Sequence, residues 1–345
     1  MPMNQTSKKA ALSTSELTIG YHQGRQKISV QQQINVTLQH GELVALIGPN
    51  GSGKSTLLRT LAGFQPPLSG DFQLLGRGVK TYTRNEWART ISIVLTEMPG
   101  ADKLTVSDLV ASGRSPYTGF SGRLSGTDRR AISLAMTSTG IASMHNHYLN
   151  RLSDGERQRA LIAKSLAQDT PIIMLDEPAA FLDFPGRIRI MHLLRQLAHN
   201  QQKAIMITTH DIGLALQYSD RLWLVSQDKP LLEGIPEALA LNGNLQQYFT
   251  GQQVDFDVNS GKFLLDVPPL NNVSVEAPVP LLFWLTHALN RHQINVTSTT
   301  QTPFHIVATH SGHVISFFKK EKLIKTWTDE SDFFEHFSAG LFNMP

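Results

Sequence analysis

Residues 43–56 read Leu43-Val44-Ala45-Leu46-Ile47-Gly48-Pro49-Asn50-Gly51-Ser52-Gly53-Lys54-Ser55-Thr56. An apolar run, which predicts a buried strand, leads into the pattern GxxxxGKS and then into a helical pattern. Glycines let the backbone curl so that successive N–H groups point inward around a phosphate, and the helix N-terminus adds partial positive charge. The stretch therefore predicts a strand, a phosphate-binding loop and a helix in that order.

Individual residues of this loop have predicted roles. Lys54 is placed to reach the β- and γ-phosphate oxygens, and the Ser55 hydroxyl is placed to ligate Mg²⁺. The alternative is a glycine-rich turn with an incidental Lys-Ser pair, and the full spacing between a strand and a helix argues against it. The predicted nucleotide-binding residues in this loop are Gly48, Pro49, Asn50, Gly51, Ser52, Gly53, Lys54, Ser55 and Thr56.

A second apolar strand pattern, in residues 171–178 (PIIMLDEP), ends in two adjacent carboxylates, Asp176 and Glu177. Neighbouring side chains on a strand point to opposite faces, so the two acids need different roles. Asp176 suits the Mg²⁺ shell, and Glu177 at the strand tip suits a general base that polarises the attacking water. An acidic pair on the surface is the structural alternative, but a pair that ends a buried-type strand after a phosphate loop favours catalysis.

Residues 151–159, RLSDGERQR, resemble the signature sequence of ABC ATPases, usually written LSGGQ. The resemblance implies that this loop and helix start form a second anion cradle. In that family the cradle closes on the γ-phosphate held by the other subunit, so one phosphate loop per chain implies a homodimer with two composite ATP sites. The predicted signature residues are Leu152, Ser153, Asp154, Gly155 and Glu156.

Other positions match the family one by one. Tyr21 looks like the aromatic residue that stacks on adenine, and Asp183 lies in a loop that resembles the family's contact to the opposite subunit. His210 follows a strand and looks like the switch histidine that contacts the γ-phosphate and orients the water. The resemblance thus implies ATP and Mg²⁺ as cofactors. It implies three catalytic residues: Lys54, Glu177 and His210.

One position departs from the family pattern. ABC ATPases normally carry a glutamine where a strand enters the helical subdomain, and here Thr96 aligns with it and Glu97 lies beside it. Either side chain has the oxygen needed to ligate Mg²⁺ or its water, and the sequence leaves the choice between them open.

Residues 104–110, 113–117 and 122–124 resemble the ATPases of iron-siderophore, haem and cobalamin importers. This resemblance implies uptake of an iron chelate or cobalamin through two transmembrane permease subunits, indirectly fed by a substrate-binding protein. The alternatives are the ATPase of an ABC exporter, whose core chemistry is identical, and a soluble ABC ATPase of translation or DNA repair. The chain has neither the two nucleotide-binding domains nor the long coiled coils typical of the last class. Spacing and charge say nothing of the substrate.

Composition agrees with a soluble ATPase. The 345 residues contain no cysteine and carry a formal net charge of only +3, too little to argue for nucleic-acid binding. No stretch approaches the ~20 apolar residues of a membrane-spanning helix, and the first residues lack the apolar core of a secretion signal. We expect the protein at the cytoplasmic face of the cell membrane, held there by the permease.

Alternating apolar strands and helices predict an α/β fold with a mostly parallel sheet, and the resemblance to ABC ATPases implies that this fold is the P-loop NTPase, ABC type. Expected features are a mixed sheet core, a small antiparallel sheet from the early strands and a helical subdomain at about residues 97–165. The ABC domain is expected at 13–250, and a small α+β accessory module at 251–345. Strands are expected at Leu17–Tyr21, Ile28–Val30, Ile34–Leu38, Glu42–Ile47, Ile91–Leu95, Ile172–Leu175, Ala204–Thr208 and Leu222–Val225.

The role of residues 251–345 stays open between a regulatory module, a dimer-stabilising module and a ligand sensor. Six of the chain's 13 histidines lie there: His287, His292, His305, His310, His313 and His336. Histidine is a common metal ligand, but there is no HxxxH pair, no cysteine and no carboxylate cluster. Partner contacts or dimer packing are therefore favoured over a metal site.

Overall fold

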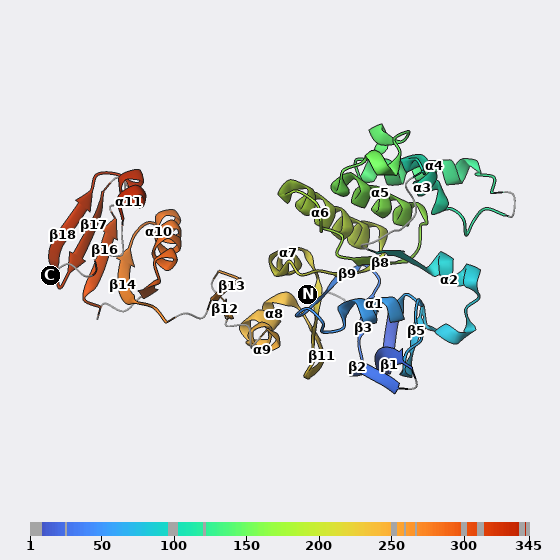
Figure 1. The fold of residues 1–345 in the computed structure, drawn as a ribbon, viewed down its shortest axis with the longest axis horizontal. Helices are drawn as coiled ribbons and strands as arrows, with labels where there is room; N and C mark the ends of the chain where they lie inside the picture. The colour runs from blue at the N-terminus through green and yellow to red at the C-terminus, as the bar shows by residue number, and fades with distance from the viewer. Residues whose placement is uncertain are drawn as a thin grey trace, which may run out of the picture. The chain divides into compact units, whose positions relative to one another are not determined.

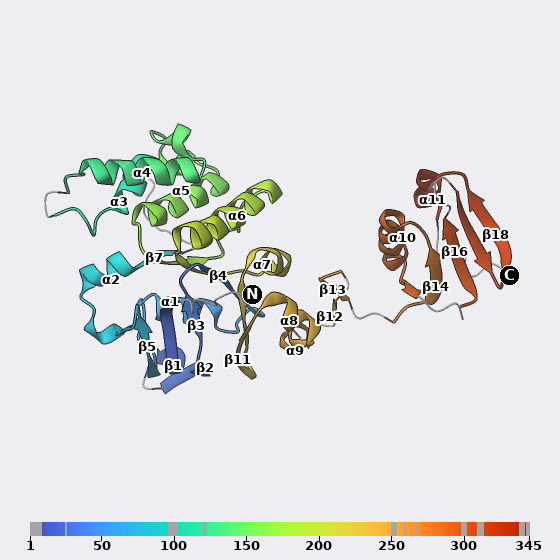
Figure 2. The ribbon, with the colours of Figure 1, turned by 180° about the vertical axis from the view of Figure 1, so that it is seen from behind.

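The structure is a computed structural model, and it describes residues 9–24, 26–95, 103–119, 122–249, 254–258, 260–265, 268–297, 302–308, 314–337 and 342. The chain divides into two compact units, residues 1–264 and residues 265–345. Figure 1 and Figure 2 show the helices and strands of each unit from opposite sides.

The central sheet of the first unit has the strand order β11-β10-β4-β9-β8-β7. Strands β10, β4, β9, β8 and β7 run parallel to their neighbours, and β11 is antiparallel to β10 at one edge. The strands are β4 (Glu42–Ile47), β7 (Ile91–Val94), β8 (Ile172–Asp176), β9 (Ala204–Thr208), β10 (Arg221–Ser226) and β11 (Lys229–Gly234). Every residue of β4, β8 and β9 is buried, as continuous apolar runs in a sheet covered on both faces predict.

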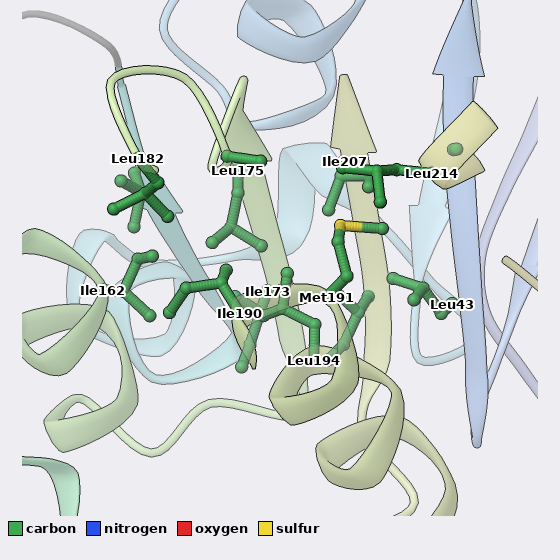
Figure 3. Packing of buried hydrophobic residues seen from close by; sticks show 14 of the residues in the cluster. Leu43, Ile162, Ile173, Leu175, Leu182, Ile190, Met191, Leu194, Ile207 and Leu214 are labelled. Atoms are coloured by element: carbon green, nitrogen blue, oxygen red, sulfur yellow. The ribbon is translucent and has the colours of Figure 1, made fainter. Parts of the chain in front are cut away.

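The two faces of this sheet form two hydrophobic cores. Alternate residues of β4 divide between them, with Leu43 and Ala45 in one and Val44 and Leu46 in the other. The first core packs against helices that include α5 (Asp154–Ala167) and α6 (Phe184–Gln201). Figure 3 shows Ile190, Met191 and Leu194 of α6 against Ile173 and Ile207 of the sheet. The second core packs against α1 (Lys54–Leu61) and the antiparallel sheet. The sheet is thus held on both sides, which fixes the positions of its strand ends.

The antiparallel sheet contains β1 (Ala10–Gln23), β2 (Gln26–Ile34), β3 (Thr37–Gln39), β5 (Ser69–Leu74) and β6 (Arg77–Gly78), in the order β2-β1-β5-β6 with β3 on β1. The predicted antiparallel subdomain is therefore present, with a longer first strand than the sequence indicated. A short 3-10 helix, η1 (Val79–Thr81), and α2 (Arg84–Thr90) connect it to β7.

The helical subdomain contains α3 (Val106–Ser112), α4 (Gly126–Ser138) and the packed helix α5. Arg114 and Asp128 form a buried ion pair of 2.8 Å between the segments that follow α3 and start α4. The remaining elements of this unit are η2 (Ala142–Met144), η3 (Leu149–Arg151), α7 (Ile212–Tyr218), α8 (Pro236–Leu241), α9 (Asn244–Tyr248), β12 (Val254–Asp257) and β13 (Lys262–Leu265).

The division between the units falls after Leu264, at the end of the β12–β13 hairpin, and not at the seam expected near Gly251. Phe263 of β13 packs with its ring centroid 5.1 Å from that of Phe249 and 5.0 Å from that of Phe256. These rings extend the first core, so the hairpin belongs with the ATPase unit. Aromatic packing across a turn decides this boundary, and composition along the chain does not reveal it.

The second unit is an α+β module, as expected. Its sheet has the order β15-β14-β16-β17-β18, with β14 (Asn271–Glu276) parallel to both neighbours and the last three strands antiparallel. The other elements are α10 (Val279–Arg291), β15 (Ile294–Thr297), β16 (Phe304–Ala308), β17 (Ile315–Lys319), β18 (Lys322–Trp327) and α11 (Glu330–His336). Both helices contribute to one core on one face of the sheet (Figures 1 and 2). In the described part of the chain, no helix is both long enough and apolar enough to cross a bilayer.

Candidate functional site

The phosphate loop runs from the end of β4 to the start of α1, and glycines shape it. Gly51 and Gly53 have φ of 78° and 102°, where a side chain would be strained. A Cβ on Gly48 would lie 2.0 Å from the Val225 carbonyl oxygen, so only glycine fits between the two strands. These three positions of the loop therefore require glycine.

Two polar side chains inside the loop fit a phosphate ligand. The Lys54 ammonium donates to the carbonyl oxygens of Gly48 and Pro49, at 2.7 and 2.9 Å. Burial lowers its pKa, while the nearby charges of Glu177 and Asp176 oppose that shift. Ser52 is fully buried, and its hydroxyl has no hydrogen-bond partner in the described part of the chain. Loop carbonyls thus hold the lysine, and the Ser52 hydroxyl retains hydrogen-bonding capacity for an anion.

Asp176 and Glu177 lie at the end of β8, next to β9, and Thr208, the last residue of β9, contacts both of them. The Thr208 hydroxyl donates to Asp176 Oδ1 at 2.5 Å and accepts from the backbone N–H of Glu177 at 3.0 Å. Glu177 has φ of 48°, a left-handed conformation uncommon for a residue with a side chain. Asp176 is buried, whereas the Glu177 side chain is partly exposed. The two acids thus differ in exposure, and a strained backbone conformation at Glu177 follows the buried Asp176.

His210, just beyond the end of β9, lies against Glu177. Its Nδ1 is 3.0 Å from Glu177 Oε2. Because a carboxylate only accepts, Nδ1–H is the donor, and Nε2 is the ring nitrogen left for another partner. The His210 side chain is well exposed, so a ligand can reach it. The pair can hold a proton and orient a water molecule beside the phosphate loop.

The signature residues start helix α5. Ser153 is the N-cap, and its backbone N–H and hydroxyl donate to Glu156 Oε2 at 2.8 and 2.9 Å. These hydrogen bonds, the backbone one first, lower the pKa of Glu156. A Cβ on Gly155 would lie 3.3 Å from the Phe181 carbonyl oxygen, so the signature loop packs against the segment after Glu177. Leu152 is buried in the core, and Asp154 is exposed in the first turn.

The structure brings together Lys54, Asp176, Glu177 and His210, and it keeps the signature loop with the helical subdomain. The signature residues lie at the start of α5, whereas Lys54 lies at the start of α1, so the two motifs are held by different elements of the chain.

Asp183 and Tyr21 lie outside this cluster. The Asp183 carboxylate accepts from the Gly186 N–H at 3.0 Å and caps α6, while the preceding Phe181 and the following Phe184 are 60% and 73% exposed. Tyr21 is 51% exposed on β1, whose partner strand β2 reaches the phosphate loop. A Cβ on Gly53 would lie 2.5 Å from Val30 of β2. Thr96 and Glu97 lie outside the described residues.

The sequence analysis did not predict two features of the site. Thr208 bridges the Asp176 carboxylate and the Glu177 backbone N–H, and the pairing of β8 with β9 that produces this contact is not visible in the chain order. The second feature is the capping box of Ser153 and Glu156, which the pattern Ser-x-x-Glu before an apolar helix could have predicted. The capping box gives a physical reason for the glutamate at this position.

Proteins similar to this chain identify its family. Residues 31–180 match the family model described as ABC transporter. The petrobactin import ATP-binding protein FpuC of Bacillus anthracis is 38% identical over 67% of this chain and 85% of its own length. The ferric enterobactin transport ATP-binding protein FepC of Escherichia coli is 36% identical over 68% of this chain and 85% of its own.

A similar solved structure is the dimeric ABC cassette MJ0796 in a post-hydrolysis state with ADP and Pi. It is 27% identical, has a TM-score of 0.58, and the match covers 65% of this chain and 98% of that one. The chain therefore belongs to the ABC transporter family as an ATP-binding protein. It is an ATPase of the ABC type, and its predicted fold class is confirmed.

Proposed function

We propose that this ATPase powers an importer of an iron chelate, such as a siderophore or haem, or of cobalamin. The cluster of Lys54, Asp176, Glu177 and His210 beside the phosphate loop carries the enzymatic part of the proposal. The import part is supported by relatives named for petrobactin import and ferric enterobactin transport, and by the motifs in residues 104–124.

In the proposed mechanism, the N–H groups of residues 48–56 surround the β-phosphate and Tyr21 stacks on the adenine. Lys54 exchanges its two carbonyl partners for phosphate oxygens, which costs little because its charge stays hydrogen-bonded throughout. Ser55 and Asp176 would hold Mg²⁺, which would supply positive charge to the phosphate oxygens. The chemistry of these side chains fits the ion, since Mg²⁺ prefers carboxylate and hydroxyl oxygens.

Glu177 is the general base in this proposal, and it takes the proton of the attacking water. His210 donates through Nδ1 to Glu177 Oε2, which fixes the direction of the carboxylate and leaves Nε2 toward the γ-phosphate side. Thr208 holds the turn that separates the two acids. These contacts of Glu177, His210 and Thr208 are made within the chain itself, so they hold the catalytic groups in place for the chemical step.

The proposed assembly is a homodimer in which Ser153, Asp154 and Gly155 of one chain close on the ATP held by the other. The Asp183 region, with its exposed Phe181 and Phe184, contributes to the same interface. MJ0796 is dimeric, and this supports the arrangement. Two permease subunits complete the transporter at the cytoplasmic face of the membrane, and a substrate-binding protein delivers the cargo to them.

An apolar cleft in the first unit supports permease binding. The cleft has a volume of about 590 Å³ and is formed by the C-terminal end of α1 and the segments around η1 and α2. Phe64 lies in the wall of the cleft and is 60% exposed, so its aromatic ring is available to a partner. We assign the cleft to a cytoplasmic segment of the permease, because an ABC transporter ATP-binding protein without a spanning helix in its described part needs such a contact.

Purification of the tagged chain from gently solubilised membranes of its own host, followed by mass spectrometry, tests the proposal. A multi-span permease recovered with a substrate-binding protein supports import, and a permease with no binding protein partner in the host supports an exporter. Recovery of ribosomal or repair proteins alone contradicts the transport role. Phe64→Asp is expected to lose the permease and keep ATP hydrolysis. Leu241→Asp, at a 74% exposed site on α8, is the matched control that keeps both.

A further inference from the structure

Helix α10 of the second unit leaves large aromatic side chains in solvent. Its buried face consists of Leu281, Leu285, Ala288 and Leu289, which pack on the sheet. Trp284 and Phe283 are 60% and 46% exposed, so the fold of this unit does not depend on burying them. Exposed aromatic residues that adjoin one another mark a binding surface more often than chance.

These rings form an ordered cluster beside a cavity. The cavity has a volume of about 400 Å³ and is lined by Trp284, His287 and Arg291 of α10 and Phe334 of α11. Positions 284, 287 and 291 form one stripe of a helix, so the three side chains project to the same side. The ring of His287 is 4.3 Å from that of Phe283 and 5.8 Å from that of Trp284. A concave site of this size, mostly aromatic with a few polar groups, has the composition of small-molecule pockets.

The polar groups of the cavity favour a negatively charged ligand. Among the described residues, Arg291 makes no ion pair. The carboxylate of Asp332 on α11 pairs instead with His336, whose Nδ1 lies 2.9 Å from Asp332 Oδ1. His287 Nδ1 donates to the Phe283 carbonyl oxygen at 3.0 Å, which leaves its Nε2 for another partner. A guanidinium favours carboxylates and stacks on aromatic faces. The cavity is therefore suited to an anion with a flat apolar body.

Two other occupants fit less well. No group of three histidine or acidic side chains able to hold a metal ion exists in the parts of the chain that the structure describes. If a second copy of the chain packed against this helix face, the two Arg291 side chains would approach each other. The cavity lining of either copy has no carboxylate to pair with them. Neither a metal ion nor a second copy would pair with the Arg291 guanidinium.

We propose that this cavity binds a small planar aromatic carboxylate of the hydroxybenzoate class. The ring lies between Trp284 and Phe334, the carboxylate pairs with Arg291, and a ring hydroxyl donates to His287 Nε2. The site gives the second unit a role as a ligand sensor, and it does not depend on the transport assignment.

Titration of the ¹⁵N-labelled full chain with sodium salicylate tests this site directly. The chain has four tryptophans, so four indole N–H signals are expected, and Trp284→Phe identifies the one from α10. Trp223 and Trp327 are fully buried, and the Trp87 indole donates to the Ala62 carbonyl oxygen at 3.0 Å. Salicylate should shift the Trp284 signal in a saturable way and leave the other three unchanged.

Two variants and a second small molecule test whether Arg291 binds the carboxylate of the ligand. Arg291→Gln should weaken salicylate binding about tenfold, the effect of losing one charge-assisted hydrogen bond. Lys322→Gln removes the same charge from an exposed position of β18 and should bind salicylate like the unmodified protein. Benzylamine has the ring with the opposite charge and should not shift the Trp284 signal.

Several results would overturn the proposal. These are no saturable shift with millimolar salicylate, equal shifts with benzylamine, or equal weakening in Arg291→Gln and Lys322→Gln. A Trp284 signal that changes with protein concentration without salicylate would show that a second copy covers the helix face. The readout requires neither ATP nor a permease, so failure here leaves the proposed transport function untouched.

Discussion

The nucleotide site of the first unit and the aromatic face of α10 in the second differ in how their polar groups are satisfied. In the first, Lys54, Asp176 and Glu177 are already hydrogen-bonded to neighbouring residues. On α10, Arg291 has no ion-pair partner among the described residues, and Trp284 is largely in solvent. Buried charges are costly without partners, whereas exposed ones are not. The candidate catalytic site is therefore part of its fold, and the α10 surface can change without affecting the fold.

Glu177→Gln, in the hydrogen-bonded site of the first unit, is expected to have the largest effect, which is on the rate of ATP turnover. The amide keeps the shape and accepts from His210, but it cannot take a proton, so turnover should fall by about 100-fold or more. Nucleotide binding should remain, because the phosphate loop is unchanged. Single-turnover hydrolysis and equilibrium binding of a labelled ATP analogue measure the two quantities. Glu237→Gln, at an exposed position of α8, is the control. Near-normal turnover in Glu177→Gln would remove this residue from the role of base.

Leu285→Ala tests whether the second unit can unfold independently of the first. Leu285 is fully buried in the core of that unit, so its truncation should cost about 2–5 kcal/mol of unfolding free energy. Calorimetry should show one transition moving to lower temperature, while ATP hydrolysis by the first unit persists. Val279→Ala on the same helix, at an 81% exposed site, should have almost no effect. A parallel loss of ATPase activity would show that the two units depend on each other.

Thr208→Val removes the hydroxyl that joins the two acids of the site. The buried carboxylate of Asp176 loses a donor and the Glu177 N–H loses an acceptor, so stability should fall by about 1–3 kcal/mol. Hydrolysis should fall together with stability, because the same hydroxyl positions the catalytic turn. Thr208→Ser, which keeps the hydroxyl, should recover most of both in urea unfolding and steady-state assays. If the valine variant hydrolyses ATP normally, the hydroxyl has only a structural role.

The Arg114–Asp128 pair gives the smallest effect, and it depends on pH. The Ser125 hydroxyl first, then the Ser125 N–H and the Arg114 guanidinium, lower the pKa of Asp128 from 3.8 to about 2. A folded-state pKa below the unfolded value stabilises the protein at neutral pH, and this contribution disappears as the pH falls from about 4 to about 2. Asp128→Asn should therefore be less stable than the unmodified protein at pH 7, with the difference narrowing in acid. Urea unfolding at several pH values measures this, with Asp228→Asn as the exposed control.

The sequence alone determined the ATPase unit and most of its site. The loop from Gly48 to Thr56 and the pair Asp176 and Glu177 depend on local spacing, which fixes where a strand ends and a helix begins. Such features are decided by residues adjacent in the chain, so they can be predicted from order alone.

Only the tertiary structure decided which distant residues meet. Thr208 reaches Asp176 because β9 lies between β4 and β8, and the β12–β13 hairpin joins the first unit because Phe263 packs on Phe249. The cavity between α10 and α11 likewise depends on two helices that share one face of a sheet. These contacts join residues far apart in sequence, and no local pattern specifies them, because strand order and side-chain packing are settled by burial of the whole core.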